Sequence, residues 1–202
     1  MSTPPLKNII EAALLAASEP LSIERLQTLF EGETAPGRDE IRKTLDELRQ
    51  DCAGRSIELQ EVGSGFRFQV SQDYAPWVMR LSEERPPRYS RALMETLALI
   101  AYRQPITRPE IEDVRGVSVS TQIMKTLQER EWIRVVGHRD VPGKPAMYGT
   151  TREFMDHFNL KNLDDLPKLA EMRDIGEIQL DLGMSEMSVP DTLVDQEDST
   201  QA

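Results

Sequence analysis

The feature that most constrains the fold is an order of elements that occurs twice along the chain. In each half, three segments with apolar residues at helical spacing precede two short segments in which apolar and polar residues alternate. Helical spacing places apolar side chains on one face of a helix, and alternation places them on one face of a strand. The sequence therefore predicts an α+β, mainly helical fold made of two similar small domains.

The first half begins with three predicted helices. Their apolar stripes lie at residues 10–17, 23–30 and 41–48. Ser22 is the predicted N-cap of the second helix, because a serine side chain accepts a hydrogen bond from a free amide of the first turn. Residues 57–62 and 66–70 then alternate as half-buried strands do, around a three-residue loop with two glycines. This arrangement indicates a hairpin.

The second half repeats this order. Its helical stripes and alternating runs lie at residues 93–101, 119–127, 132–136 and 146–149. Thr107 and Glu110 have the spacing of a capping box at the start of the middle helix. Thr150 and Glu153 have the same spacing, which predicts a second capping box at the start of a terminal helix. Three helices followed by a two-stranded wing is the winged-helix pattern, so we predict two tandem winged-helix domains.

Changes in composition mark the expected domain boundaries. Residues 82–89 are polar and contain a Pro-Pro pair, which fits neither a helix interior nor a strand ladder, so we expect a linker there. The N-terminal winged-helix domain is then expected at residues 1–81 and the C-terminal one at residues 90–170. Residues 171–202 are expected to form an acidic, disordered tail.

The distribution of charge disfavours general DNA binding. The chain has a formal net charge of −11. Residues 1–80 carry 13 acidic and 9 basic side chains, residues 88–160 carry 9 and 11, and residues 161–202 carry 11 and 3. Most of the acidity therefore lies in the tail. Neither predicted domain has the strong positive charge that drives non-specific binding to phosphates.

The sequence offers no recognisable catalytic or cofactor site. His138 and His157 are 19 residues apart, and neither an HExxH nor a CxxC motif is present. The single cysteine, Cys52, is interpreted as a free thiol at a helix end. No apolar run approaches the ~18 residues of a membrane-spanning helix, and the first residues lack the regions of a signal peptide. We therefore expect a cytoplasmic protein that is not an enzyme and has no cofactor, no metal and no membrane partner.

Four strings in the second half resemble the bacterial segregation and condensation protein B (ScpB) family. They are ETLALIAYRQPITR at residues 95–108, IEDVRGV at 111–117, GHRDVPGKP at 137–145 and YGTT at 148–151. The resemblance covers roughly residues 6–170 and is most specific over residues 95–167. Two positions depart from the family pattern, because Lys144 replaces an expected Arg and Asn159 stands where many members have Gly.

The resemblance implies a non-enzymatic adaptor that acts in chromosome condensation and segregation during cell division. Members of the family have two winged-helix domains and form homodimers, mainly through the N-terminal domain. They bind the kleisin subunit ScpA, which bridges the heads of the SMC ATPase. On this resemblance the C-terminal domain binds the kleisin, DNA is contacted indirectly, and the protein associates with the nucleoid through SMC.

We predict a kleisin-binding surface in the second half from residues that match the family strings and that helix periodicity does not require. They are Tyr102, Gln104, Pro105, Ile106, Arg115, Gly116, Val117 and Tyr148. Trp132, which opens a strand after the third helix, is interpreted as a core residue instead.

A winged-helix DNA-binding transcriptional regulator is the alternative hypothesis. Winged helices often place the third helix in the DNA major groove and the wing on phosphates. Candidate phosphate contacts in the second half are Arg134, Arg139 and Lys144. The third helix of the first half, at residues 39–51, carries five acidic and three basic side chains, which disfavours a phosphate backbone. A regulator would need a basic recognition helix, and neither half has one, so the adaptor is the preferred hypothesis.

Overall fold

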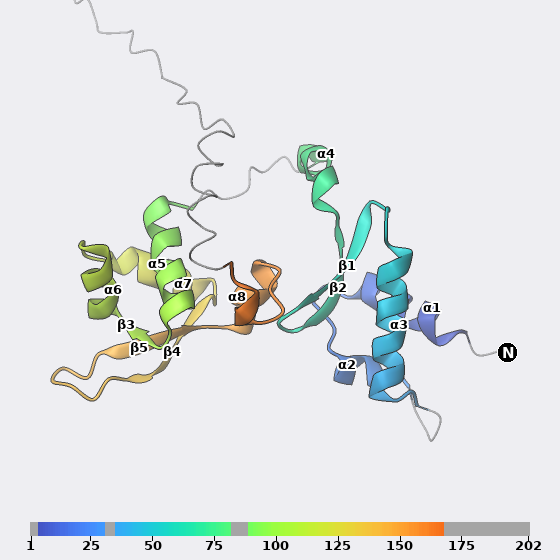
Figure 1. The fold of residues 1–202 in the computed structure, drawn as a ribbon, viewed down its shortest axis with the longest axis horizontal. Coiled ribbons are helices and arrows are strands. Elements are labelled where there is room, and N and C mark those ends of the chain that lie inside the picture. The colour runs from blue at the N-terminus through green and yellow to red at the C-terminus, as the bar shows by residue number, and fades with distance from the viewer. Residues whose placement is uncertain (1–3, 31–34, 82–88, 168–202) are drawn as a thin grey trace, which may run out of the picture. The chain divides into compact units, whose positions relative to one another are not determined.

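The computed structural model of the chain describes residues 4–30, 35–81 and 89–167 (Figure 1). Within these ranges the predicted order of helices and strands occurs twice, and the described residues up to Leu166 belong to one compact unit. Each half encloses its own hydrophobic core. The predicted fold class, two tandem winged-helix units, is therefore confirmed. The expected tail and almost all of the expected linker lie outside the described residues.

The first half is built from three helices and a hairpin. In chain order these elements are α1 (Leu6–Ala16), α2 (Ile23–Gln27), α3 (Arg38–Asp51), β1 (Ile57–Val62) and β2 (Gly65–Val70). Ser22 caps α2 as predicted, because its side chain accepts a hydrogen bond from the Arg25 amide at 3.2 Å. Ile10, Leu26 and Ile41 are fully buried among these elements, so burial of apolar surface holds the helices against the hairpin.

A short pairing adds a third extended segment to this hairpin. Leu21, just before α2, pairs with Phe66 of β2, and each amide donates to the other's carbonyl at 2.9 Å. Gly65 adopts φ +150°, and a Cβ at that position would clash with the Leu21 backbone. The sequence predicts a glycine here for the turn of the hairpin. The structure adds a second reason, because a side chain at this position would keep the backbone of Leu21 from approaching the hairpin.

The second half repeats the arrangement with a fuller sheet. Its elements are α5 (Arg91–Arg103), β3 (Ile106–Thr107), α6 (Arg108–Arg115), α7 (Thr121–Glu129), β4 (Ile133–His138), β5 (Ala146–Thr150), α8 (Arg152–His157) and a 3₁₀ turn at Leu163–Asp165. Strand β5 lies between β3 and β4 and is antiparallel to both. Strands β4 and β5 form the long wing below α5 and α6 in Figure 1. The pairing of β3 with β5 thus joins the helices to the wing.

One predicted capping box is confirmed and the other is wrong. The Thr107 side chain accepts from the Glu110 amide at 3.4 Å, and the Glu110 side chain accepts from the Thr107 amide at 2.8 Å. The N-cap of α8 is Thr151, which accepts from the Phe154 amide at 3.1 Å. Because Thr150 remains part of β5, α8 begins one residue later than the predicted box requires.

Trp132 is a core residue, as predicted. Its side chain is 3% exposed, and its ring centroid lies 5.1 Å from that of Tyr89 and 5.3 Å from that of Phe158. These aromatic contacts fix the start of β4 against the residues that follow α8.

The end of α8 contacts the hairpin of the first half. The Ser64 amide donates to Asp156 Oδ1 at 2.9 Å, and Arg67 Nη2 donates to the Asp156 carbonyl at 2.9 Å and to Asn159 Oδ1 at 2.6 Å. Asp156 is 6% exposed, so the Ser64 amide provides a donor for a buried carboxylate, while Arg67 binds the backbone and side-chain oxygens at the end of α8. Asn159 has φ +55°, a left-handed conformation that Gly and Asn tolerate best. Compared with the Gly that the resemblance leads us to expect at this position, Asn159 therefore still permits the helix to end and adds a hydrogen-bond acceptor for Arg67.

The Gln104 side chain joins α5 to the central strand of the second sheet. Its Oε1 accepts from the Thr150 amide at 2.7 Å, and its Nε2 donates to the Thr150 hydroxyl at 2.9 Å and to the Ala101 carbonyl at 3.2 Å. Gly149 leaves the room for this side chain, since a Cβ there would lie 2.9 Å from Gln104 Oε1. The Gln104 amide group therefore serves as hydrogen-bond partner for the last residue of β5.

Replacing Gln104 by Ala should destabilise the chain by about 1–3 kcal/mol, because it leaves partly buried polar groups of β5 without their partner. The free energy of unfolding, from a urea titration followed by far-ultraviolet circular dichroism, measures the effect. Gln122→Ala is a matched control, since the exposed Gln122 side chain donates to the Thr126 hydroxyl and, within the described ranges, to no strand. A Gln104→Ala change no larger than that of the control would contradict the proposed role.

Two carboxylates organise α6. Glu110 caps the helix at Thr107 and accepts from Arg139 Nη2 at 2.7 and 3.0 Å, while Glu112 accepts from the Val119 amide at 2.9 Å. The Thr107 amide and the Arg139 guanidinium hold the pKa of the Glu110 carboxyl below its usual range. The Val119 amide does the same for the pKa of the Glu112 carboxyl. Both groups thus favour folding while they are ionised.

The stability contributed by these lowered pKa values should be present above about pH 4.3, the usual pKa of glutamate, and be lost as the pH falls through the folded values. We expect Glu110→Gln to lower stability at pH 7 and to reduce the loss of stability between pH 7 and acidic pH. Urea midpoints measured across this range test the expectation. Glu129→Gln, on the exposed end of α7, is the control, and equal pH profiles for the two variants would refute the role of Glu110.

Candidate protein-interaction site

The sheet brings together most of the nominated residues of the second half. Tyr102 lies at the end of α5, Gln104 and Pro105 connect α5 to β3, and Ile106 of β3 pairs with Tyr148 of β5. The remaining three, Arg115, Gly116 and Val117, lie at the other end of α6. The nominated set therefore forms two groups at opposite ends of one helix.

Several nominated side chains have structural roles. Ile106 is 4% exposed and belongs to the hydrophobic core, and Tyr148 packs against that core. The polar groups of Gln104 bind Thr150 and Ala101, as described above. The Arg115 side chain is 10% exposed and donates from Nη2 to Glu95 Oε2 at 3.3 Å, which joins α6 to α5. The side chains of these four residues thus mainly hold the surrounding elements together and contribute little exposed area for a partner.

The exposed members are Pro105, Gly116 and Val117. Gly116 ends α6 in the left-handed conformation, with φ +69°, and its amide donates to the Glu112 carbonyl. Val117 follows at 57% exposure. An exposed valine directly after a helix end is available to a partner.

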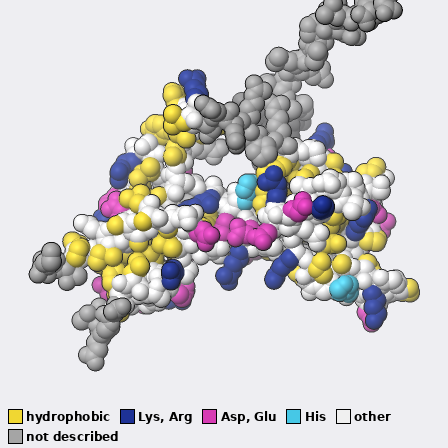
Figure 2. Space-filling view, turned by 180° about the vertical axis from the view of Figure 1, so that it is seen from behind, with side chains coloured by type: hydrophobic (Ala, Val, Ile, Leu, Met, Phe, Trp, Pro, Cys, Tyr) yellow, Lys and Arg dark blue, Asp and Glu magenta, His cyan; other side chains and the backbone are white. Residues whose placement is uncertain are grey.

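The wing carries the three candidate phosphate contacts, and they differ in availability. Arg134 on β4 and Lys144 in the β4–β5 loop are exposed and have no ion-pair partner among the residues that the structure describes. The third, Arg139, forms an ion pair with Glu110 and is therefore less available to a phosphate. Figure 2 shows dark blue and cyan side chains at the wing, at the right of that view, with magenta side chains beside them. The wing therefore lacks a continuous basic surface.

A groove beside β3 contains residues that the sequence pattern did not single out. It has a volume of 370 Å³ and is lined by Arg103, Pro105, Ile106, Glu110, Asp113, Val114 and Arg139. Pro105 and Ile106 belong to the nominated set, whereas Arg103, Asp113 and Val114 do not. The only sequence signal for them is their position within the family-like strings at residues 95–108 and 111–117.

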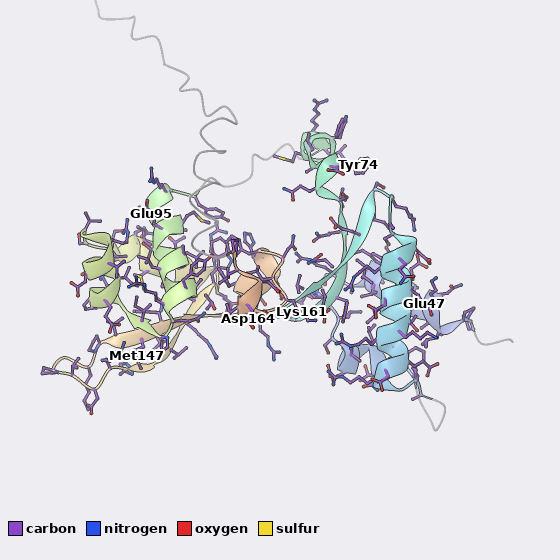
Figure 3. All side chains as sticks on the ribbon, viewed as in Figure 1. Glu47, Tyr74, Glu95, Met147, Lys161 and Asp164 are labelled. Carbon is purple, nitrogen blue, oxygen red and sulfur yellow. The ribbon has the colours of Figure 1, made fainter. Side chains whose placement is uncertain are left out.

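A second exposed apolar surface lies in the first half. After β2 the chain forms α4 (Ala75–Val78) between two 3₁₀ turns, Gln72–Tyr74 and Met79–Leu81. We call this segment's exposed residues the α4 patch: Tyr74 at 43%, Trp77 at 63%, Val78 at 41%, Met79 at 57% and Leu81 at 84%. Figure 2 shows yellow side chains gathered there, and Figure 3 labels Tyr74 on it. Large apolar side chains grouped in this way indicate an interaction surface.

Metal binding, thiol reactivity and membrane spanning can each be judged from the described residues. Among residues 4–30, 35–81 and 89–167, no three His, Cys, Asp or Glu side chains come together as a metal site would need. Cys52 is buried, and its burial raises the pKa of the thiol, which disfavours the nucleophilic thiolate. No helix in the described part of the chain is long and apolar enough to cross a membrane.

Comparison with known proteins identifies relatives over most of the chain. The family described as "Segregation and condensation complex subunit ScpB" matches residues 8–169. A segregation and condensation protein B homolog from Coxiella burnetii is 56% identical over 177 residues, which are 88% of this chain and 85% of that protein. Segregation and condensation protein B from Syntrophotalea carbinolica is 42% identical over 177 residues, covering 87% of each chain.

One solved structure among the relatives is described as a dimer of the ScpB N-terminal domain complexed with an ScpA peptide. It is 30% identical and covers 42% of this chain and 100% of that chain, with a TM-score of 0.36. The dimer and the peptide are findings about that protein. The family match over residues 8–169 and the sequence identities are sufficient by themselves: the chain belongs to the ScpB family of segregation and condensation complex subunits.

Proposed function

We propose that this chain is a non-enzymatic adaptor of an SMC–kleisin complex, which acts in chromosome condensation and segregation by binding the kleisin ScpA as a homodimer. The observation that carries the proposal is the family match, because it spans both winged-helix units and describes a subunit of a complex. We place the protein in the cytoplasm, associated with the nucleoid through SMC.

The surfaces of the two halves support a division of roles, in which the first half forms the homodimer and the second half binds the kleisin. The α4 patch gives the first half an apolar surface, and the groove beside β3 with Val117 gives one to the second half. An adaptor needs two separate apolar surfaces, since it must bind itself and its partner at once. Aromatic and apolar anchors of this kind commonly supply most of the binding energy at protein interfaces.

The charges disfavour the alternative, a DNA-binding regulator. On α3 of the first half, acidic side chains outnumber basic ones, and several of the basic ones already pair with carboxylates. In the second half, Arg139 pairs with Glu110, which leaves Arg134 and Lys144 as the available cations of the wing. Two phosphate contacts would give only weak binding, because affinity for the DNA backbone grows with the number of phosphates that are neutralised.

The α4 patch is the proposed homodimer surface. A two-fold dimer uses the same patch on both copies, so an apolar surface can cover itself. Replacing Trp77 by Asp should therefore shift the chain from dimer to monomer, by at least about a tenfold weaker dimer affinity, because Trp is a frequent anchor of interfaces. Sedimentation velocity over a range of protein concentrations measures the change.

Leu15→Asp is the matched control for this experiment, because Leu15 on α1 is also 63% exposed. It should leave the sedimentation profile unchanged. A Trp77→Asp variant that dimerises like the unchanged chain would show that the dimer uses another surface.

The central test of the adaptor role is binding to the purified kleisin encoded in the same genome. We expect the full chain to form a stable complex with it in size-exclusion chromatography without DNA, and to recruit the SMC protein only when the kleisin is present. A mobility-shift assay at physiological salt is the companion experiment. A sequence-specific shift without kleisin binding would favour the regulator.

A further inference from the structure

The tip of the first hairpin packs closely against α8, although the two segments lie far apart in the sequence. Gly63 and Ser64 form the turn between β1 and β2, and Met155 lies on α8. A Cβ at Gly63 would lie 2.8 Å from Met155 Cβ and 2.9 Å from Met155 Cε. Because the Met155 Cβ is bonded to the backbone, it cannot turn aside. A side chain at position 63 would therefore push the two segments apart.

Hydrogen bonds surround this packing contact, with donors from the first half and acceptors from the second. The Ser64 amide binds the buried Asp156 carboxylate, as described above. Arg67 Nη2 binds the Asp156 carbonyl and the Asn159 side chain. Gln60 Nε2 donates to the Asn159 carbonyl at 3.4 Å. Hydrogen bonds depend steeply on distance and angle, so several of them at one contact favour one arrangement of the two segments.

An ion pair brings a cation of the second half to a carboxylate of the first. Lys161, which Figure 3 labels, places its Nζ 3.2 Å from Glu61 Oε2 on β1. Arg42 and Arg49 of α3 also lie near the Glu61 carboxylate, at 3.8 and 3.9 Å. The Glu61 side chain is only 18% exposed, so salt screens its pairs less than it screens exposed ones. The second half thus completes a charge cluster of the first.

We propose that residues 60–67 and 155–161 form a latch, which holds the two winged-helix halves in one arrangement. Single hydrogen bonds and exposed ion pairs contribute little to stability, since their partners bind water when the halves separate. The packing of Gly63 on Met155 is therefore the decisive contact, because it brings the segments close enough for the polar contacts to form. Gly63 does not adopt a left-handed conformation, so this close approach is what requires a glycine.

The latch adds a physical property to the proposed adaptor, but it does not depend on that function. When the latch is closed, a partner that contacts both halves does not have to order them against each other, which lowers the cost of binding. The arrangement of the halves is a property of the chain alone, so it can be tested without any partner.

The test measures the distance between nitroxide labels on the two halves of the full chain by pulsed electron–electron double resonance. The labels are attached at Lys43→Cys on α3 and Gln128→Cys on α7, both exposed positions, in a chain that carries Cys52→Ala. Labelled chain is equilibrated with an excess of unlabelled chain, so that distances between two copies do not contribute. We expect one narrow distance distribution for this reference chain, because the latch allows one arrangement.

Gly63→Ala in the reference chain is the decisive variant. It removes no hydrogen-bonding group, and the three nearest atoms that its Cβ would meet all belong to Met155. Since overpacking is unfavourable, the ratio of open to closed chains should rise by about tenfold or more. Combining it with Arg67→Ala, which removes polar contacts, should raise the ratio further and broaden the distance distribution. Circular dichroism of each variant establishes that it is folded.

Gly37→Ala is the matched control. Gly37 has φ −67°, which alanine adopts readily, and a Cβ there would meet no atom within 4 Å. This variant should leave the distance distribution of the reference chain unchanged. A broad distribution in the reference chain itself, or equal widths for the Gly37→Ala chain and the combined variant, would overturn the latch. Neither result bears on kleisin binding, so the proposed function stands or fails by its own test.

Discussion

The pairing of β3 with β5 is the constraint on which the second domain depends. Only two residues of β3 take part, with Ile106 opposite Tyr148 and Thr107 opposite Met147. Ile106 anchors this pairing in the hydrophobic core, and Thr107 continues directly into the capping box of α6. The start of α6, the wing and the end of α5 are therefore fixed by one short ladder, and the groove lies where these three elements meet.

In the first domain, a single residue makes the corresponding contact between the start of a helix and the hairpin. Leu21 takes the place that Ile106 has in the second domain, since it pairs with the second strand of the hairpin just before a helix begins. The approach depends on Gly65, whereas in the second domain Gly149 leaves room for the Gln104 side chain. The same topology is thus stabilised by different local contacts in the two halves. This explains how the halves share a fold although their sequences have little in common.

Helices and hairpins could be predicted from the sequence because apolar periodicity and capping residues are local signals. Ser22, Thr107 and Trp132 have the roles that these signals predict. The cap at Thr151 was missed because Thr150, three residues before Glu153, has the capping-box spacing and Thr151 does not, and only the structure shows that Thr150 still belongs to β5. The pairing of β3 was missed because two residues are too few to alternate.

The candidate site was harder to predict because exposure and pairing depend on contacts distant in sequence. Arg115 and Arg103 are both arginines at helix ends, yet the Arg115 side chain binds Glu95 and is mostly covered, while the exposed Arg103 side chain has no ion-pair partner among the described residues. Likewise, the apolar residues of α4 follow no long helical stripe, so their exposure became evident only in the structure.

Asn159 shows what one departure from a family pattern can change. A glycine at this position would end α8 equally well, but it would leave the Arg67 guanidinium one acceptor short. A relative that has glycine here and arginine at position 67 would need another acceptor for that arginine. Residues 67 and 159 should consequently vary together among relatives, although 91 positions separate them in the chain.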